Sequence, residues 1–252
     1  MMWPQLAKAR QPFRFFTALV LQEATGLRAA TLPQLLRLLR DVPDGCIYHH
    51  THHFLLQHHY LTPEPTNDFA YWTSRVLGEE ALGELLASID TIRYDSLQKL
   101  RQALIQTVEG YLQRSPLARF KFASEGEEFF FVKSIHVIVP TSFTASNLQE
   151  FAEALAHVSR HSLYHHIFDA RLRLGHSMND FSLWFEQELG EHELAKEVVS
   201  LDPYAYTLEA LRSILLDLIR KRLVELSTEG AQPLAGASQE TRESRLGTER
   251  TT

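Results

Sequence analysis

The sequence predicts a mainly helical α+β protein, an internally duplicated helical repeat in which each half is one strand followed by about five helices. Residues 13–50 align with residues 129–166 without a gap, and ten of these 38 positions are identical. After a shortening by four residues the match resumes, with ten identities over the 24 positions of 67–90 and 179–202. Unrelated sequences would share roughly one or two of those 24 positions by composition. The two halves are therefore expected to be copies of one unit.

Each copy begins with a Phe-rich stretch, Phe13–Leu21 and Phe129–Val139, that is typical of a strand. Before the second stretch, residues 119–122 alternate polar and aromatic side chains and are followed by a turn-like segment. This pattern predicts a hairpin between about 118 and 139. We expect the first strand to join the same small antiparallel sheet. The strands are expected to knit the two halves together, because an isolated two-stranded ribbon is only marginally stable in water.

Helices are expected after each strand. Thr31 and Asn147 stand at N-cap positions, and the leucines that follow them keep the helical spacing. The repeated tripeptide Tyr-His-His belongs to the second helix, at about 45–61 and 161–174. Further helices are expected to start at Asn67-Asp68 and Asn179-Asp180, just after Gly78 and Gly190, and near Leu97 and Leu208.

The chain is thus divided into a first repeat, 12–115, and a second repeat, 116–226. We expect the two to pack as one body about an approximate two-fold axis. Residues 227–252 contain almost no apolar side chains, which predicts a disordered tail.

Composition excludes several classes of function. The net charge is −6 and the basic residues are dispersed, which argues against nucleic acid as a partner. No apolar run reaches the roughly 18–20 residues that a membrane helix needs. The single cysteine, Cys46, rules out an internal disulfide and fits a cytoplasmic protein. Whether the protein is a monomer or a homodimer is left open.

The histidines suggest a metal site. His49 and His53 lie one helical turn apart, and His165 faces Asp169 in the same way, which is a usable spacing for a divalent transition metal. His176 and Asp180 could complete such a site. The sequence contains no His-Glu-x-x-His motif, however, and histidine-rich helix faces often contact only water or backbone. The structural interpretation is therefore favoured, and no cofactor is expected.

A second set of candidates could bind a ligand. His50 lies on the apolar stripe of its helix, and His166 repeats this in the second copy. Two inward-facing histidines indicate either hydrogen-bonded core residues or the lining of a site where the copies meet, and the core interpretation is favoured. Tyr48 and Tyr164, one on each Tyr-His-His helix, complete this candidate ligand site.

Other polar residues have simpler explanations. Asn67-Asp68 and Asn179-Asp180 are expected to be helix caps, and Trp72 and Trp184 are expected in the core. The sequence contains no glycine-rich phosphate loop, no Gly-x-Ser-x-Gly elbow and no Cys-x-x-Cys pair.

Four stretches carry a resemblance to a known family: Ile47–Phe54 with the sequence Ile-Tyr-His-His-Thr-His-His-Phe, Pro63–Trp72, Leu77–Glu79 and Ala87–Asp90. Together they resemble an uncharacterised bacterial and archaeal family known only as a domain of unknown function. The resemblance covers about residues 12–225. It implies a stand-alone prokaryotic domain and carries over no activity, cofactor or catalytic residue.

The leading hypothesis is a non-catalytic scaffold that binds a small ligand or a protein partner where the two repeats meet. The alternative is a metal-dependent enzyme, for example a hydrolase, that uses His49, His53, His165, His166 and Asp169 to hold a metal-bound water. A third hypothesis is a pH-sensitive assembly module, because the thirteen histidines titrate near neutrality.

Overall fold

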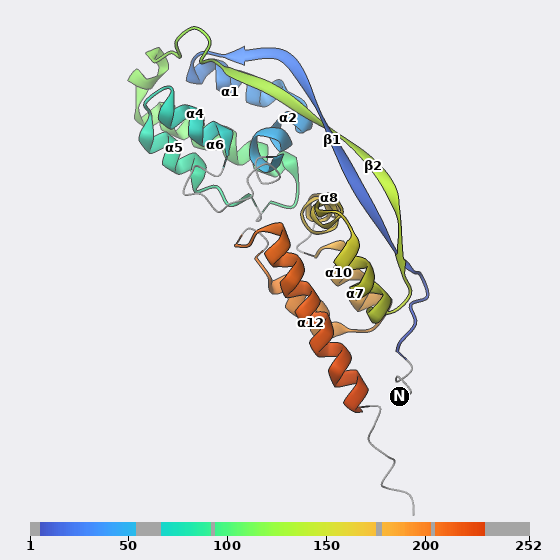
Figure 1. The fold of residues 1–252 in the computed structure, drawn as a ribbon. Coiled ribbons are helices and arrows are strands. Elements are labelled where there is room, and N and C mark those ends of the chain that lie inside the picture. The colour runs from blue at the N-terminus through green and yellow to red at the C-terminus, as the bar shows by residue number, and fades with distance from the viewer. Residues whose placement is uncertain (1–5, 54–66, 92–93, 175–177, 203–204, 230–252) are drawn as a thin grey trace, which may run out of the picture.

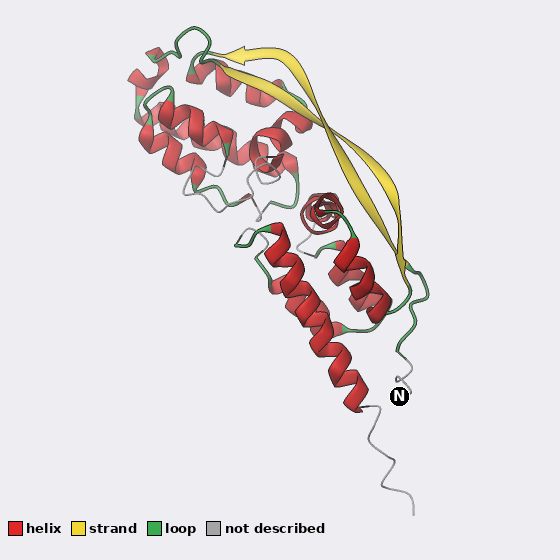
Figure 2. Ribbon diagram, in the orientation of Figure 1, coloured by secondary structure: helices red, strands yellow, loops and turns green. Residues whose placement is uncertain are grey.

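Two helical units lie one after the other along the same side of a long two-stranded ribbon (Figure 1). The computed structural model describes residues 6–53, 67–91, 94–174, 178–202 and 205–229. Helices make up most of this part of the chain, and the ribbon is its one sheet (Figure 2). The expected fold class, mainly helical with a small antiparallel sheet, is confirmed.

The ribbon consists of β1, Phe13–Ala29, and β2, Phe129–Ala145, which pair antiparallel. The predicted hairpin between 118 and 139 is wrong. Residues Pro116–Phe120 form a short 3-10 helix, and the side chains of Phe120 and Phe122 are 77% and 74% exposed. β2 pairs with β1 instead, a partner of equal length whose ends are anchored in the two cores.

The register of the ribbon is centred on Val20 and His136, which pair with each other and are 116 positions apart in the chain. Register shifts occur between Arg14 and Phe16 and between Ala24 and Arg28, one near each end. Extra residues at such irregularities bend a strand and increase its twist. Both ends of the ribbon are buried in the helical cores, Phe13 and Ala145 in one and Ala29 and Phe129 in the other.

Each strand begins in one helical unit and ends in the other. Phe13 and Phe15, at the start of β1, are buried in the core of the second unit. Phe129 and Phe131, at the start of β2, are buried in the core of the first unit. Each core is therefore completed by a segment on the far side of the boundary expected at residue 115, and the units depend on each other for folding.

The helices follow the predicted order. The first unit contains α1 Leu32–Asp41, α2 Asp44–Tyr48, a π-helical turn His49–His53, α4 Asp68–Arg75, α5 Glu80–Ala87 and α6 Leu97–Arg114. The second contains α7 Leu148–His157, α8 Arg160–Tyr164, a π-helical turn His165–Asp169, α9 Ala170–Leu174, α10 Asp180–Gln187, α11 His192–Ser200 and α12 Leu208–Glu229.

The predicted helix starts are largely correct. The side chains of Thr31, Asn67, Asn147 and Asn179 each accept a hydrogen bond from a backbone N–H in the first turn of their helix. The Tyr-His-His helices differ from expectation because a π-helical turn begins directly after each tyrosine. Part of the first one, 54–61, lies outside the described residues, as does the predicted tail beyond Glu229.

A buried arginine ties the long helix to the first helix in each unit. Arg101 donates to the carbonyl oxygen of Leu39, and Arg212 donates to the carbonyl oxygens of Leu155 and Val158. These carbonyls lie at the C-terminal ends of α1 and α7, where a cation also interacts favourably with the helix dipole. The leucine spacing of the sequence gave no indication of this contact.

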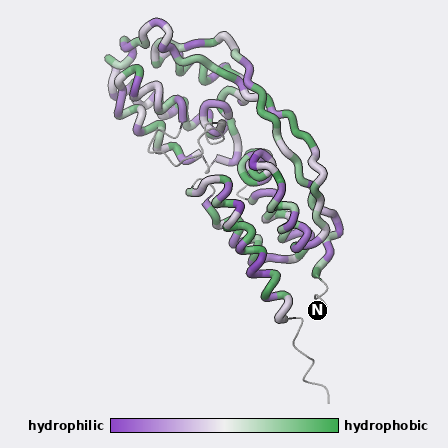
Figure 3. The backbone as a smooth tube through the Cα atoms, in the orientation of Figure 1, coloured by the Kyte–Doolittle hydropathy of each residue, from purple (hydrophilic) through white to green (hydrophobic). Residues whose placement is uncertain are grey.

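The face of the ribbon that points away from the helices is apolar at its centre. Leu19 pairs with Val137 and Leu21 with Ile135, and all four side chains are exposed. Figure 3 shows hydrophobic stretches along both strands. Among the described residues, no helix is long and apolar enough to cross a membrane.

Candidate functional site

Two pairs of histidine and aspartate fasten the ribbon to the helices, one pair in each unit. In the first unit, Nδ1 of His50 lies 2.8 Å from Oδ2 of Asp68, and the backbone N–H of Val132 donates to Nε2 of His50 over 3.0 Å. In the second unit, Nδ1 of His166 lies 2.7 Å from Oδ2 of Asp180, and the N–H of Phe16 donates to Nε2 over 2.8 Å. We call each set of three groups a histidine clamp.

The two bonds of a clamp fix the proton on the imidazole. Nε2 must present a lone pair to the strand N–H, and Nδ1 must therefore donate its proton to the carboxylate. The ring is neutral in this arrangement, and the contact to the aspartate is a hydrogen bond to a charged acceptor. A neutral, fully bonded imidazole is a typical structural histidine.

Local sequence positions both groups of the clamp. Asn67 and Asn179 cap α4 and α10, which places the next residue, an aspartate, in the first turn of the helix. The strand amides belong to Phe16 and Val132, each next to a register shift of the ribbon. The cap predicted for each Asn-Asp pair is thus correct for the asparagine, and the aspartate has a separate partner that only the fold reveals.

The imidazoles of His50 and His166 do not meet. The ring of His50 packs against Phe69, Phe129 and Phe131 in the core of the first unit. The ring of His166 packs in the core of the second unit, against Phe13, Phe15 and Phe181. The two candidate histidines are therefore separated, because each is required inside its own unit to hold the strand.

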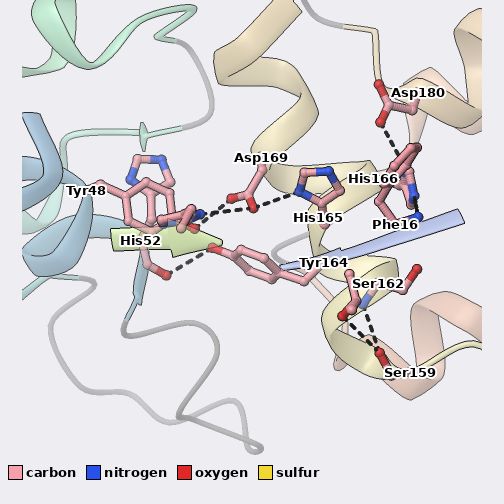
Figure 4. Close-up of polar contacts among 12 residues, drawn as sticks. Phe16, Tyr48, His52, Ser159, Ser162, Tyr164, His165, His166, Asp169 and Asp180 are labelled. Carbon is pink, nitrogen blue, oxygen red and sulfur yellow. Dashed lines mark hydrogen bonds and ion pairs between the residues drawn. The ribbon is translucent and has the colours of Figure 1, made fainter. Parts of the chain in front are cut away.

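The two tyrosines do lie where the units meet. The hydroxyl of Tyr48 donates to Oδ1 of Asp169 over 2.6 Å, and the hydroxyl of Tyr164 donates to the carbonyl oxygen of His52 over 3.1 Å. Figure 4 shows the Asp169 carboxylate between Tyr48 and His165. We call this group the junction: Tyr48, His52, His136, Tyr164, His165 and Asp169.

Two imidazoles flank the same carboxylate oxygen of Asp169. Nδ1 of His165 lies 3.4 Å from Oδ2, and Nδ1 of His136, on the central pair of the ribbon, lies 3.6 Å from it. The His165–Asp169 contact is the one expected from their helical spacing. No such expectation arose from the sequence for His136 or His52.

Burial and hydrogen bonding set the charge of the junction. Burial alone would raise the pKa of Asp169, but hydrogen bonds from His136, His165 and Tyr48 outweigh it and lower the pKa from 3.8 to about 2. Complete burial lowers the pKa of His52 from 6.5 to about 4. Burial, followed by the nearby Tyr164 and Asp169, raises the pKa of Tyr48 well above 10.0. At neutral pH the junction therefore holds a carboxylate, a neutral His52 and a phenol.

The metal candidates are only partly brought together. His165, His166 and Asp180 each offer a ligand atom, all within 4.8 Å of one another, so this buried group could hold a metal ion. In the first unit, Nδ1 of His49 lies 3.0 Å from the hydroxyl oxygen of Ser134. The side chain of His53 and all of His176 lie outside the described residues.

A groove of about 600 Å³ runs beside the second clamp. Its lining includes Arg14, Phe16 and Leu183 together with both clamp residues, His166 and Asp180. The clamp side chains themselves stay largely buried, with His166 3% and Asp180 16% exposed.

The fold and these contacts define a helical protein held on a two-stranded ribbon by paired histidine clamps. The chain belongs to the DUF5752 family, a family of unknown function, whose profile matches residues 10–220. The expected resemblance to a family of unknown function is thus confirmed. The chain is similar to the solved structure of OrfY from Thermoproteus tenax, with a TM-score of 0.73 and 30% sequence identity over 86% of this chain and 98% of that one. No curated protein matches the chain.

Proposed function

We propose that this protein is a non-catalytic scaffold, a duplicated module that binds a small ligand or a protein partner at the junction of its two halves. We further propose that it acts in the cytoplasm of a prokaryote. The observation that carries the binding function is the junction itself: a low-pKa carboxylate, two phenols and three imidazoles gathered between two units whose own cores are complete.

The state of the clamps argues against catalysis by the repeated histidines. A histidine that acts as general base needs a nitrogen within hydrogen-bond reach of a substrate. Both nitrogens of His50 and both nitrogens of His166 are already bonded, to a carboxylate and to a strand amide. Using either ring in a reaction would detach the ribbon from a helical unit.

The pattern of difference between the halves supports the junction as the site. His136 corresponds to Val20 in the alignment of the repeats, and continuing the gapless alignment just beyond His50 pairs His52 with Phe168 and His53 with Asp169. His136 and His52 both lie at the junction, whereas the clamp residues are the same in both halves. A duplicated protein that acquires a function is expected to diverge where the function resides, and these polar substitutions occur there.

A metal-dependent enzyme remains the second candidate, supported by the proximity of His165, His166 and Asp180. The clamp opposes it. A metal on Nδ1 of His166 would leave the proton on Nε2, facing the N–H of Phe16 at 2.8 Å. A metal on Nε2 would displace that N–H. Elemental analysis of protein purified without a histidine tag should find no stoichiometric transition metal, and one metal per chain would favour the enzyme.

A comparison of two baits tests the scaffold function. Wild-type protein and an Asp169→Asn variant, each immobilised, would be exposed to lysate and to a metabolite extract. An Asp217→Asn variant is the matched control, because it makes the same change at a side chain that is 76% exposed on α12. We expect a bound species that wild type and Asp217→Asn retain and Asp169→Asn loses. Equal retention by all three baits would place binding away from the junction.

A further inference from the structure

The two helical units have separate cores and few described side chains that join them directly. Tyr48, at the end of α2 in the first unit, belongs to the core cluster of the second unit. Its ring stacks on that of His52 and meets the ring of His136 edge-on, with centroids 5.3 and 4.4 Å apart. Its hydroxyl reaches Asp169 on the far side. A single tyrosine therefore contacts the first unit, the ribbon and the second unit.

The ribbon supplies the other connection, and its anchoring points lie off centre. The clamps hold it at Phe16 and at Val132, one on each side of the central pair of Val20 and His136. The segment between the clamps consists of two strands only, and two-stranded ribbons twist more readily than larger sheets. Because each strand completes the core of both units, the units cannot separate, but the ribbon between them can bend.

The central segment is covered on its inner face by one short helix from each unit. α2 approaches β2 so closely that a Cβ on Gly45 would lie 2.7 Å from the carbonyl oxygen of Ser134. α8 is preceded by Ser159, whose hydroxyl lies 3.4 Å from that of Thr17 on β1. Tyr48 ends α2 and Tyr164 ends α8, so a bend of the ribbon would change the distance across the junction.

We infer that Asp169 is a latch: its contacts with Tyr48 and His136 close the two helical units against each other, and the ribbon between the two clamps is the hinge. The inference does not rest on the proposed function, since it concerns the angle between the units and needs no ligand. It describes an equilibrium between closed and open forms that a ligand at the junction could shift.

The residues of the latch are suited to a contact that can open. The aligned counterpart of Asp169 is His53, and the counterpart of His136 is Val20, so neither of these two residues is required by the fold of a single unit, whereas Tyr48 is repeated as Tyr164. The clamps, by contrast, are the same in both halves and hold strand to helix. When the latch opens, water can reach the carboxylate and the phenol, both of which water solvates well. A purely apolar contact would lose this compensation.

Distances between spin labels on the two units test the latch. The labels are attached to cysteines that replace Gln102 on α6 and Ser213 on α12, one exposed position on the long helix of each unit. The single cysteine, Cys46, is first changed to serine, the residue at its counterpart Ser162, which is also buried. Double electron–electron resonance is then measured for the parent, for Asp169→Ala, for Tyr48→Phe and for the exposed control Asp217→Asn.

The parent and Asp217→Asn should give one narrow distance distribution. Asp169→Ala should give a shifted or second peak, and Tyr48→Phe, which removes only the hydroxyl, a smaller shift in the same direction. Unchanged distributions in both junction variants, with circular dichroism showing them folded, would overturn the latch and leave the ribbon alone to set the angle. If Asp169→Ala does not fold, the distance distribution of Tyr48→Phe tests the latch on its own. Binding of a ligand plays no part in the readout, so this result is separable from that of the bait comparison.

Discussion

The clamps of the two units have the same hydrogen bonds but different exposure to solvent. The side chain of Asp68 is 41% exposed and that of Asp180 is 16% exposed, while both histidine rings are almost fully buried. A hydrogen bond to a charged acceptor is stronger where water does not screen it. The same hydrogen bond is therefore expected to stabilise the second unit more than the first. The second clamp also lies beside the groove.

Removal of a clamp histidine should have the largest effect. We expect His166→Ala to lower the free energy of unfolding by about 3 kcal/mol or more, because it opens a cavity among Phe13, Phe15 and Phe181 and leaves the Phe16 N–H unbonded. His50→Ala should cost about the same. Urea unfolding of both variants measures this. A loss under about 1 kcal/mol in either would contradict the structural role of that clamp.

The pH dependence of stability should show the next largest effect. It distinguishes the two halves because His52 of the first unit corresponds to Phe168 of the second, which does not titrate. The pKa of His52 is about 4 in the folded protein and 6.5 when unfolded, so between these values only the unfolded chain binds a proton at this ring. The contribution of neutral His52 to stability is therefore complete above pH 6.5 and is lost as the pH falls to 4. A shift of that size corresponds to about 3 kcal/mol. His52→Phe copies the counterpart Phe168, which stacks on Tyr164 as His52 stacks on Tyr48.

Wild type should thus lose stability between pH 6.5 and 4 more steeply than His52→Phe. Thermal unfolding across this range gives both curves. Parallel curves would show that His52 titrates in the folded protein as it does in the unfolded chain, and that its burial has no consequence for stability.

The aspartates of the clamps should show the smaller, unequal effects that their exposure predicts. An asparagine can still accept the histidine proton, so only the charge is lost. We expect Asp180→Asn to cost about 1–2 kcal/mol, and Asp68→Asn under about 1 kcal/mol because solvent screens it. The reverse order in chemical unfolding would mean that solvent exposure does not govern the strength of the two clamps.

Metal removal should have the smallest effect. Both nitrogens of His166 are bonded within the protein, so dialysis against a chelator should leave the melting temperature unchanged. Adding zinc to the dialysed protein gives the matching measurement. A rise in melting temperature that saturates at one ion per chain, and that His166→Ala abolishes, would show that His166 belongs to a metal site and not to a clamp.

Much of the fold could be predicted from local patterns. The helix starts at Thr31, Asn67 and Asn147 follow from capping chemistry, which involves residues three positions apart. The hairpin prediction failed because the alternation at 119–122 suggested a strand, whereas a 3-10 helix runs to Phe120 and β2 pairs with β1. The clamp aspartates were missed for a related reason: each is bonded to a histidine at least 14 positions away, and no periodic pattern links the two.

The sequence by itself determined that each of two Phe-rich strands is followed by a similar series of helices, and that Asn67 and Asn179 start helices. It also determined that the chain belongs to a family of unknown function. Tertiary structure alone decided that β1 completes the second core, that His136 and Asp169 meet, and that His50 and His166 stay apart. The reason is the range of the interactions. Caps and helical stripes act within a few residues, whereas strand exchange and the junction join segments that come together only when both units have packed on one ribbon.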